Sequence, residues 1–119
     1  MPYSAAAKNA MLDALGVTHV SAHSANPGST GASELSGGSP AYARKAITHA
    51  AATGGSRSAS TQPVFDIPAG GVVAFIGYWT AVTGGTYLGY DDVVSESFAG
   101  QGTYTLSTNV LDLNATASA

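Results

Sequence analysis

Two histidines, His19 and His23, have the spacing with which a helix presents a pair of metal ligands on one face. The surrounding segment, VTHVSAH, is rich in residues that favour strands. On a strand, residues four apart are separated by about 13 Å, so one ion cannot bridge the two rings. His49 has no acidic or thiol neighbour at a ligand-like spacing. We therefore predict no metal site and no cofactor.

Carboxylates and hydroxyls give no clearer sign of catalysis. Asp91 and Asp92 are adjacent, but the alternating oxygen ligands that wrap a calcium ion are missing, and a solvated turn is the preferred interpretation. The segment GGSPA around Ser39 lacks the second glycine of a nucleophile elbow. No glycine pattern typical of a phosphate-binding loop is present. The sequence therefore predicts a protein that is not an enzyme.

Aromatic side chains suggest an alternative function. An exposed platform of rings with nearby amides and carboxylates would bind a sugar, and a carbohydrate-binding module is therefore an alternative hypothesis. The residues available for such a platform are Tyr78, Trp79, Tyr87, Tyr90 and Tyr104. Large aromatics in strands usually pack in a core or an interface, and we prefer that interpretation.

The elements that position these residues are mostly strands. The stretch GGVVAFIGYW, residues 70–79, contains no polar break, whereas a strand with one wet face would alternate. Leaving Val73, Phe75 and Trp79 in water would cost on the order of 5 kcal/mol. We expect an opposing sheet over one face, and over the other either the N-terminal helix or a neighbouring subunit.

Turn signals divide the rest of the chain. Ser4 is a typical N-cap and Gly16 a typical terminator, which predicts a short helix at about residues 4–15. Strands are expected at 17–23, 41–50 and 62–67, a long loop at about 24–40, a shorter loop at 53–60, and a hairpin at Gly84-Gly85. With about seven or eight short strands, the sequence predicts a mainly β fold. The expected architecture is an antiparallel, jelly-roll-like β-sandwich with a short N-terminal helix. It should form one domain over residues 1–119.

Composition narrows the possible partners. Four basic residues face seven acidic ones, too few cations for a nucleic-acid surface. No apolar run approaches the roughly twenty residues that span a bilayer, so no membrane partner is expected. Charged residues make up only 9% of the chain, which suits a surface that packs against neighbouring proteins.

A family resemblance points the same way. The segments AAKNAMLDAL, THVSAHSANPGSTGASELSGGSPAYARKAIT, QPVFDIPAGGVVAFIGYW, GGTYLGY and ESFAGQGTYTL resemble short tail-fibre-like or minor structural proteins encoded by phages and prophages of actinobacteria. The resemblance covers nearly the whole chain and implies a non-enzymatic virion component. Because the N-terminus contains no apolar segment of signal-peptide length, we expect the protein to be made in the host cytoplasm. Because the chain has neither a collagen-like glycine repeat nor coiled-coil heptads, we expect a compact module rather than a fibre shaft.

These observations predict an accessory subunit of a phage particle that acts through contacts with other virion proteins, in a symmetric homo-oligomer. Attachment to the capsid, as a decoration or minor capsid protein, and to the tail, as a minor tail or tail-fibre-like protein, both remain open. The loops at 24–40 and 53–60 are expected to reach neighbouring proteins. The candidate interface residues are Val73, Phe75, Trp79, Tyr78, Tyr87, Asn26, Pro27, Glu34 and Leu35. A host-surface glycan is the partner under the alternative hypothesis.

Overall fold

The computed structural model describes residues 4–107 and 109–112 and confirms the predicted mainly β fold with one short N-terminal helix. The helix is α1 (Ala5–Ala14). The described strands are β1 (His19–His23), β2 (Lys45–Ala46), β3 (Ser56–Ser58), β4 (Val64–Ile67), β5 (Val72–Trp79), β6 (Tyr87–Ser97), β7 (Gly102–Thr105) and β8 (Val110–Asp112). Every strand pair is antiparallel, as expected.

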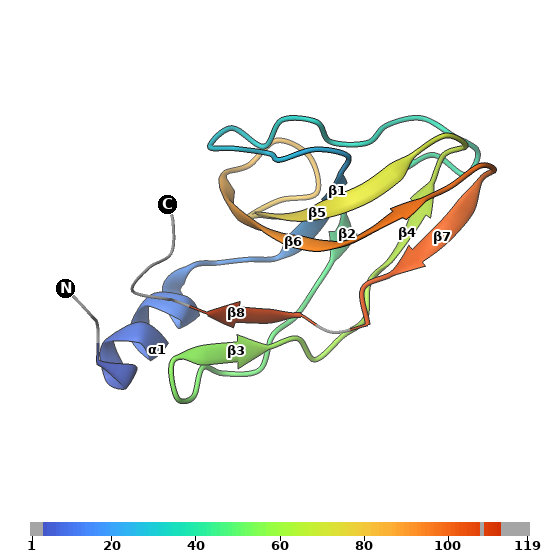
Figure 1. Cartoon of the computed structure of the whole chain (residues 1–119). Helices are drawn as coiled ribbons and strands as arrows, with labels where there is room; N and C mark the ends of the chain where they lie inside the picture. Colours follow the sequence, from blue (N-terminus) through green and yellow to red (C-terminus); the bar gives the residue numbers. More distant parts are fainter. Residues whose placement is uncertain (1–3, 108, 113–119) are drawn as a thin grey trace.

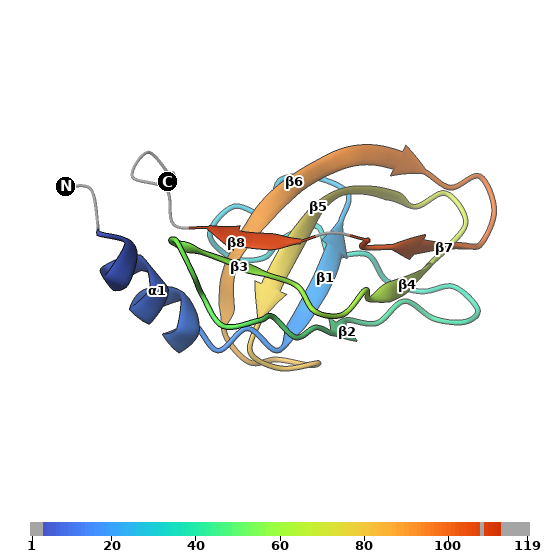
Figure 2. The ribbon, with the colours of Figure 1, turned by 90° about the horizontal axis from the view of Figure 1, so that it is seen from below.

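The strands form one larger sheet and two small ribbons. The four-stranded sheet has the order β2-β1-β5-β6, and the ribbons pair β3 with β8 and β4 with β7. The ribbons lie across one face of the sheet, while the long connection between β1 and β2 runs over the opposite face (Figures 1 and 2). This arrangement agrees with a sandwich in which the second layer consists of short ribbons.

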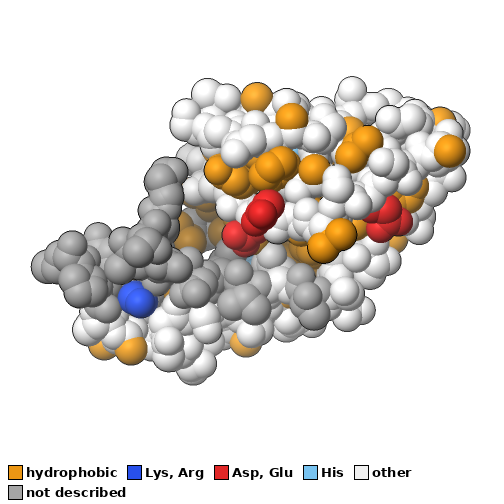
Figure 3. All heavy atoms as spheres, viewed as in Figure 1, with side chains coloured by type: hydrophobic (Ala, Val, Ile, Leu, Met, Phe, Trp, Pro, Cys, Tyr) orange, Lys and Arg blue, Asp and Glu red, His pale blue; other side chains and the backbone are white. Residues whose placement is uncertain are grey.

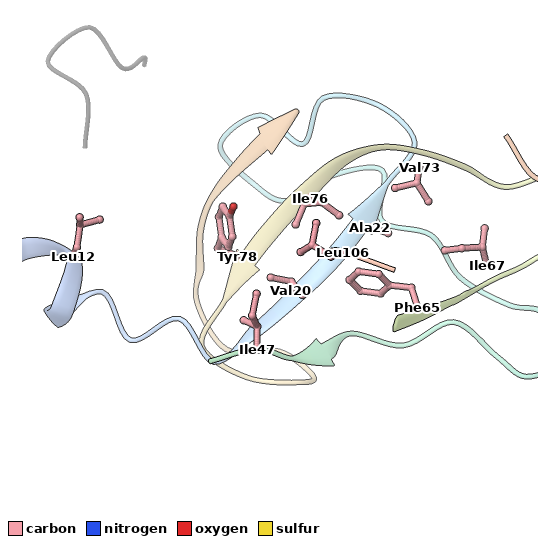
Figure 4. Packing of buried hydrophobic residues seen from close by; sticks show 10 residues of the cluster. All are labelled: Leu12, Val20, Ala22, Ile47, Phe65, Ile67, Val73, Ile76, Tyr78 and Leu106. Atoms are coloured by element: carbon pink, nitrogen blue, oxygen red, sulfur yellow. The ribbon is translucent and has the colours of Figure 1, made fainter. Parts of the chain in front are cut away.

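The hydrophobic core lies between the sheet and the ribbons (Figure 4). Its buried members are Leu12, Val20, Ala22, Ile47, Phe65, Ile67, Val73, Ile76, Tyr78 and Leu106. Val73 shares this core with Ile76 and Tyr78, although strict alternation would put Val73 on the other face of β5. The register between β5 and β6 shifts between Val73 and Phe75, which accounts for the change of side.

The helix lies at one end of the molecule beside β3 (Figure 1). The Ser4 Oγ caps it by accepting a hydrogen bond from the Ala7 amide at 3.1 Å. The Asn9 side chain accepts a hydrogen bond from the Gly55 amide at 2.8 Å, which joins the helix to the turn before β3. Of the two covers expected over the second face of β5, the helix or a neighbouring subunit, the helix is therefore not the one observed.

The strand expected at 41–50 is reduced to the two residues of β2. The Ala22 amide, which a longer β2 would engage, instead donates to the Tyr42 hydroxyl at 2.8 Å, and the Ala22 carbonyl accepts from the Leu35 amide at 3.0 Å. A side chain and a loop thus replace the strand ladder. The segment at 53–60, expected to be a loop, contains β3, because residues 56–58 pair with β8.

Candidate interaction surfaces

The face of the sheet opposite the core, here called the outer face, is covered by the chain's own loop at 24–40. The residues that face this side are Ser21 and His23 of β1, Phe75, Gly77 and Trp79 of β5, and Tyr87 and Tyr90 of β6. The Tyr87 hydroxyl donates to the Gly28 carbonyl at 3.0 Å, and the Asn26 amide donates to the Tyr90 hydroxyl at 3.2 Å. These contacts hold the loop against the sheet.

A buried hydrogen-bond network holds the middle of the 24–40 loop against the outer face. Ser21 and His23 are both 0% exposed. The Ala32 carbonyl can only accept, so His23 Nδ1 carries a proton and donates to it at 2.7 Å. The unprotonated Nε2 then accepts from the Ser21 hydroxyl at 2.6 Å, and Ser21 Oγ accepts from the Trp79 indole at 2.8 Å. Burial lowers the pKa of His23, which favours this neutral state.

The Ser21–His23 pair has the distance of a nucleophile and its general base. Both side chains are fully buried beneath the loop, however, so a substrate has no access to the hydroxyl in this structure. Gly77 leaves room for the pair, because a Cβ there would lie 2.5 Å from Ser21 Oγ and 2.7 Å from His23 Nε2. The arrangement therefore serves packing.

A second set of contacts holds the other end of the loop. The Arg44 guanidinium lies 3.4 Å from the centroid of the Trp79 ring. Its Nε donates to Glu34 at 3.0 Å, and its Nη1 donates to the Gly84 carbonyl at 2.9 Å. Glu34 also accepts from the Tyr42 hydroxyl at 2.9 Å. The Arg44 guanidinium is thus stacked on the Trp79 indole and paired with the Glu34 carboxylate, and it links the loop to the hairpin that joins β5 and β6.

The candidate interface residues fall into three groups by burial. Val73, Tyr78, Trp79 and Pro27 are buried within the chain, so their side chains form no free surface in this fold. Phe75, Tyr87, Glu34 and Leu35 are partly exposed, and Asn26 is exposed. Most of these residues attach the loop to the sheet or complete the core. The contact surface proposed below therefore does not rest on them.

The longest of the described strands, β6, presents a surface that was not predicted from the sequence. It lies at the edge of the sheet, with β5 as its neighbour among the described strands. Asp91 and Asp92 lie within this strand, so the predicted solvated turn is wrong. Residues 94–97 are exposed, and the Val94 side chain is 91% exposed. The unbroken run of residues without Gly or Pro from 90 to 98 was the available signal for a long strand.

Acidic side chains follow the course of β6, and no basic side chain lies beside them on the face shown in Figure 3. Asp91 is anchored, because it accepts a hydrogen bond from the Tyr78 hydroxyl at 2.6 Å. Burial and this carboxylate raise the pKa of Tyr78, so its hydroxyl remains a donor. Asp92 and Glu96 are exposed and give the edge a negative charge.

Among the described residues, no three His, Asp or Glu side chains are grouped as metal ligands. The His19 ring contacts the Thr18 hydroxyl at 2.9 Å, His49 contacts Asn109 at 2.8 Å, and His23 belongs to the buried network. Over the same part of the chain, no helix has the length and apolarity needed to cross a membrane.

The family model described as podophage GP4 fiber I protein gp80 matches residues 3–114. No curated protein and no solved structure matches the chain. The matched range spans nearly the entire sequence, in agreement with the resemblance of its segments to tail-fibre-like proteins. The chain therefore belongs to the podophage GP4 fiber I protein gp80 family and is a fibre-like structural protein of a phage virion.

Proposed function

We propose that this chain is an accessory fibre subunit that attaches to another virion protein through the outer edge of β6. The observation that carries this proposal is a strand of 11 residues at the end of a sheet, with residues 94–97 exposed. Such an edge offers backbone N–H and C=O groups to an extended segment of a partner, which then adds a strand to the sheet.

The charge of the edge selects the kind of partner. Asp92 and Glu96 are exposed on β6, and this strand has no basic residue. A segment that carries Lys or Arg opposite these carboxylates gains electrostatic complementarity and faster association. Two copies of β6 paired with each other would instead place like charges opposite one another, which is unfavourable. We therefore assign this edge to a basic segment of a different virion protein.

This proposal keeps the homo-oligomer predicted from the sequence but assigns it to a surface other than β6. It also keeps a non-enzymatic role in adhesion. Between capsid and tail, the fibre family favours the tail. The actinobacterial origin suggested by the resemblance remains a prediction.

Carbohydrate binding has weaker support. Two of the candidates for a sugar platform, Trp79 and Tyr78, are only 8% and 5% exposed. Tyr90 is 37% exposed, and its hydroxyl is already bonded to Asn26. A flat, open aromatic surface, which sugar stacking requires, is not formed by these rings while the loop is closed.

A charge substitution in the particle tests the proposal. The double variant D92N/E96Q removes two negative charges from β6. The variant A10K/A14K adds two positive charges on exposed positions of α1 and thus changes the net charge equally. We expect D92N/E96Q to lower the number of chains retained per purified particle by several-fold, and A10K/A14K to leave that number unchanged. Retention should be measured by quantitative mass spectrometry, with both variants matched to wild type in thermal stability.

Equal retention of the two variants would overturn the assignment to β6. Equal retention together with specific binding of the purified chain to a glycan array would favour the carbohydrate-binding alternative.

A further inference from the structure

The loop at 24–40 is held to the outer face by groups that respond differently to acid. Its middle is fastened by the bond from His23 Nδ1 to the Ala32 carbonyl, and its end by the Arg44–Glu34 pair. Among these groups, histidine has the ordinary pKa nearest to neutrality. The acid response of the closed loop therefore depends on His23.

The hydrogen-bond directions in the network permit only the neutral imidazole without a loss. Protonation at Nε2 would replace an acceptor with a donor aimed at Ser21 Oγ, 2.6 Å away. That oxygen already accepts from the Trp79 indole, and its own hydrogen would lose its acceptor. A buried donor left without a partner is unfavourable, because it has lost its hydrogen bond to water without gaining another. Nδ1 still donates to the Ala32 carbonyl after protonation, so the loss falls on the Ser21–His23 bond beneath the loop. Uptake of one proton thus destabilises the closed state, in which the ring is buried, relative to an open state in which water solvates the ring.

The charged surroundings of His23 do not compensate for this loss. Burial, which is the largest effect, opposes the protonated ring, as does Arg44, whereas the hydrogen bond to the Ala32 carbonyl and the charge of Glu34 favour it. The neighbouring strand β5 contributes the uncharged Gly77 and Trp79. Asp92 of β6 shares the outer face but lies one strand further away. The ring is also 0% exposed, so water does not reach a cation formed there while the loop is closed.

We propose that His23 is a pH-sensitive latch, whose protonation releases the 24–40 loop and exposes the aromatic side chains of the outer face. This device is independent of the β6 edge. The released surface contains the rings of Phe75, Trp79, Tyr87 and Tyr90, together with the Ser21 and His23 side chains.

The direction of the effect follows from linkage. The pKa of His23 is lowered from 6.5 in the closed state and returns toward that value when the loop opens. Closure is therefore fully stable above about pH 6.5 and weakens as the pH falls toward the lowered value. Between about pH 7.5 and about pH 5.5, the opening constant should rise by up to about tenfold.

Amide hydrogen exchange of the purified full-length chain tests the latch. After correction for intrinsic exchange, protection of the Leu35 amide, which bonds to the Ala22 carbonyl, should fall by up to about tenfold over this pH range. Protection in the core strands β1 and β5 should remain. Trp79 is the chain's single tryptophan, and its emission should shift to the red with the same midpoint.

Two variants separate His23 from the other histidines. H23Q carries no titratable ring and should lose the pH dependence, while the double variant H19Q/H49Q should retain it. If H23Q fails to fold, the imidazole resonance of His23 in the wild-type chain replaces it, and this resonance should titrate together with Leu35 exchange. Leu35 protection that stays constant with pH, or pH dependence that persists in folded H23Q, would overturn the proposal.

Discussion

Replacing Gly77 with alanine perturbs the centre of the outer face. The added Cβ would lie 2.5 Å from Ser21 Oγ and 2.7 Å from His23 Nε2. Neither group can move away without breaking a bond, because Ser21 is tied to Trp79 and His23 to Ala32. Overpacking costs about 1–3 kcal/mol, and a buried group that loses its partner costs a similar amount.

We therefore expect Gly77→Ala to lower the free energy of unfolding by about 3 kcal/mol, which corresponds to a fall in Tm of about 10 °C. Gly100→Ala is the matched control, because a Cβ there meets no atom within 4 Å and Gly100 does not adopt a positive φ. Urea denaturation gives the free energies, and Trp79 emission reports on the local packing. A Gly77→Ala protein as stable as Gly100→Ala would refute the network as the reason for this glycine.

Two further substitutions test the cover and the core. Gly31→Ala should be more destabilising than Gly28→Ala. Both glycines have positive φ values, 77° and 63°, but only a Cβ at position 31 would meet the Trp79 ring, at 2.6 Å. Equal losses of Tm in thermal melts would count against tight packing of the loop on the sheet. Phe65 is 0% exposed, so Phe65→Ala should lower the free energy of unfolding by about 3–5 kcal/mol in urea denaturation. Val94→Ala should change it by no more than about 0.5 kcal/mol, because Val94 is 91% exposed. Similar values for the two variants would contradict the assigned core.

The sequence predicted the parts of the fold that depend on local pattern. The cap at Ser4 and the terminator at Gly16 located the helix within one or two residues of α1. The apolar run that begins at Val72 became β5, and the Gly84-Gly85 signal lies in the turn between β5 and β6. These features depend on backbone preferences and side-chain periodicity, and both can be recognised within a single short segment of the sequence.

The cover of β5 was not predicted, because it depends on contacts between distant segments. Residues 24–40 were identified as a long loop, a class that is often ordered by a partner. Here that partner is the chain's own sheet, reached through His23, Trp79 and Tyr87. The burial of Ser21 and His23 was not predicted, because it depends on their hydrogen bonds to each other, to Trp79 and to Ala32. The β6 edge was missed because adjacent acids resemble a turn.

A cross-linking experiment on intact particles tests the central claim, that the chain attaches through β6. The chain contains no cysteine, so Val94→Cys introduces a single thiol at a 91% exposed position of this strand. Ala10→Cys on the exposed side of α1 is the control. With a thiol-linked photocrosslinker, we predict that position 94 yields a covalent adduct with a different virion protein, through a peptide rich in Lys or Arg, and that position 10 yields little. Equal adducts at both positions, or adducts only with copies of this chain, would contradict the account.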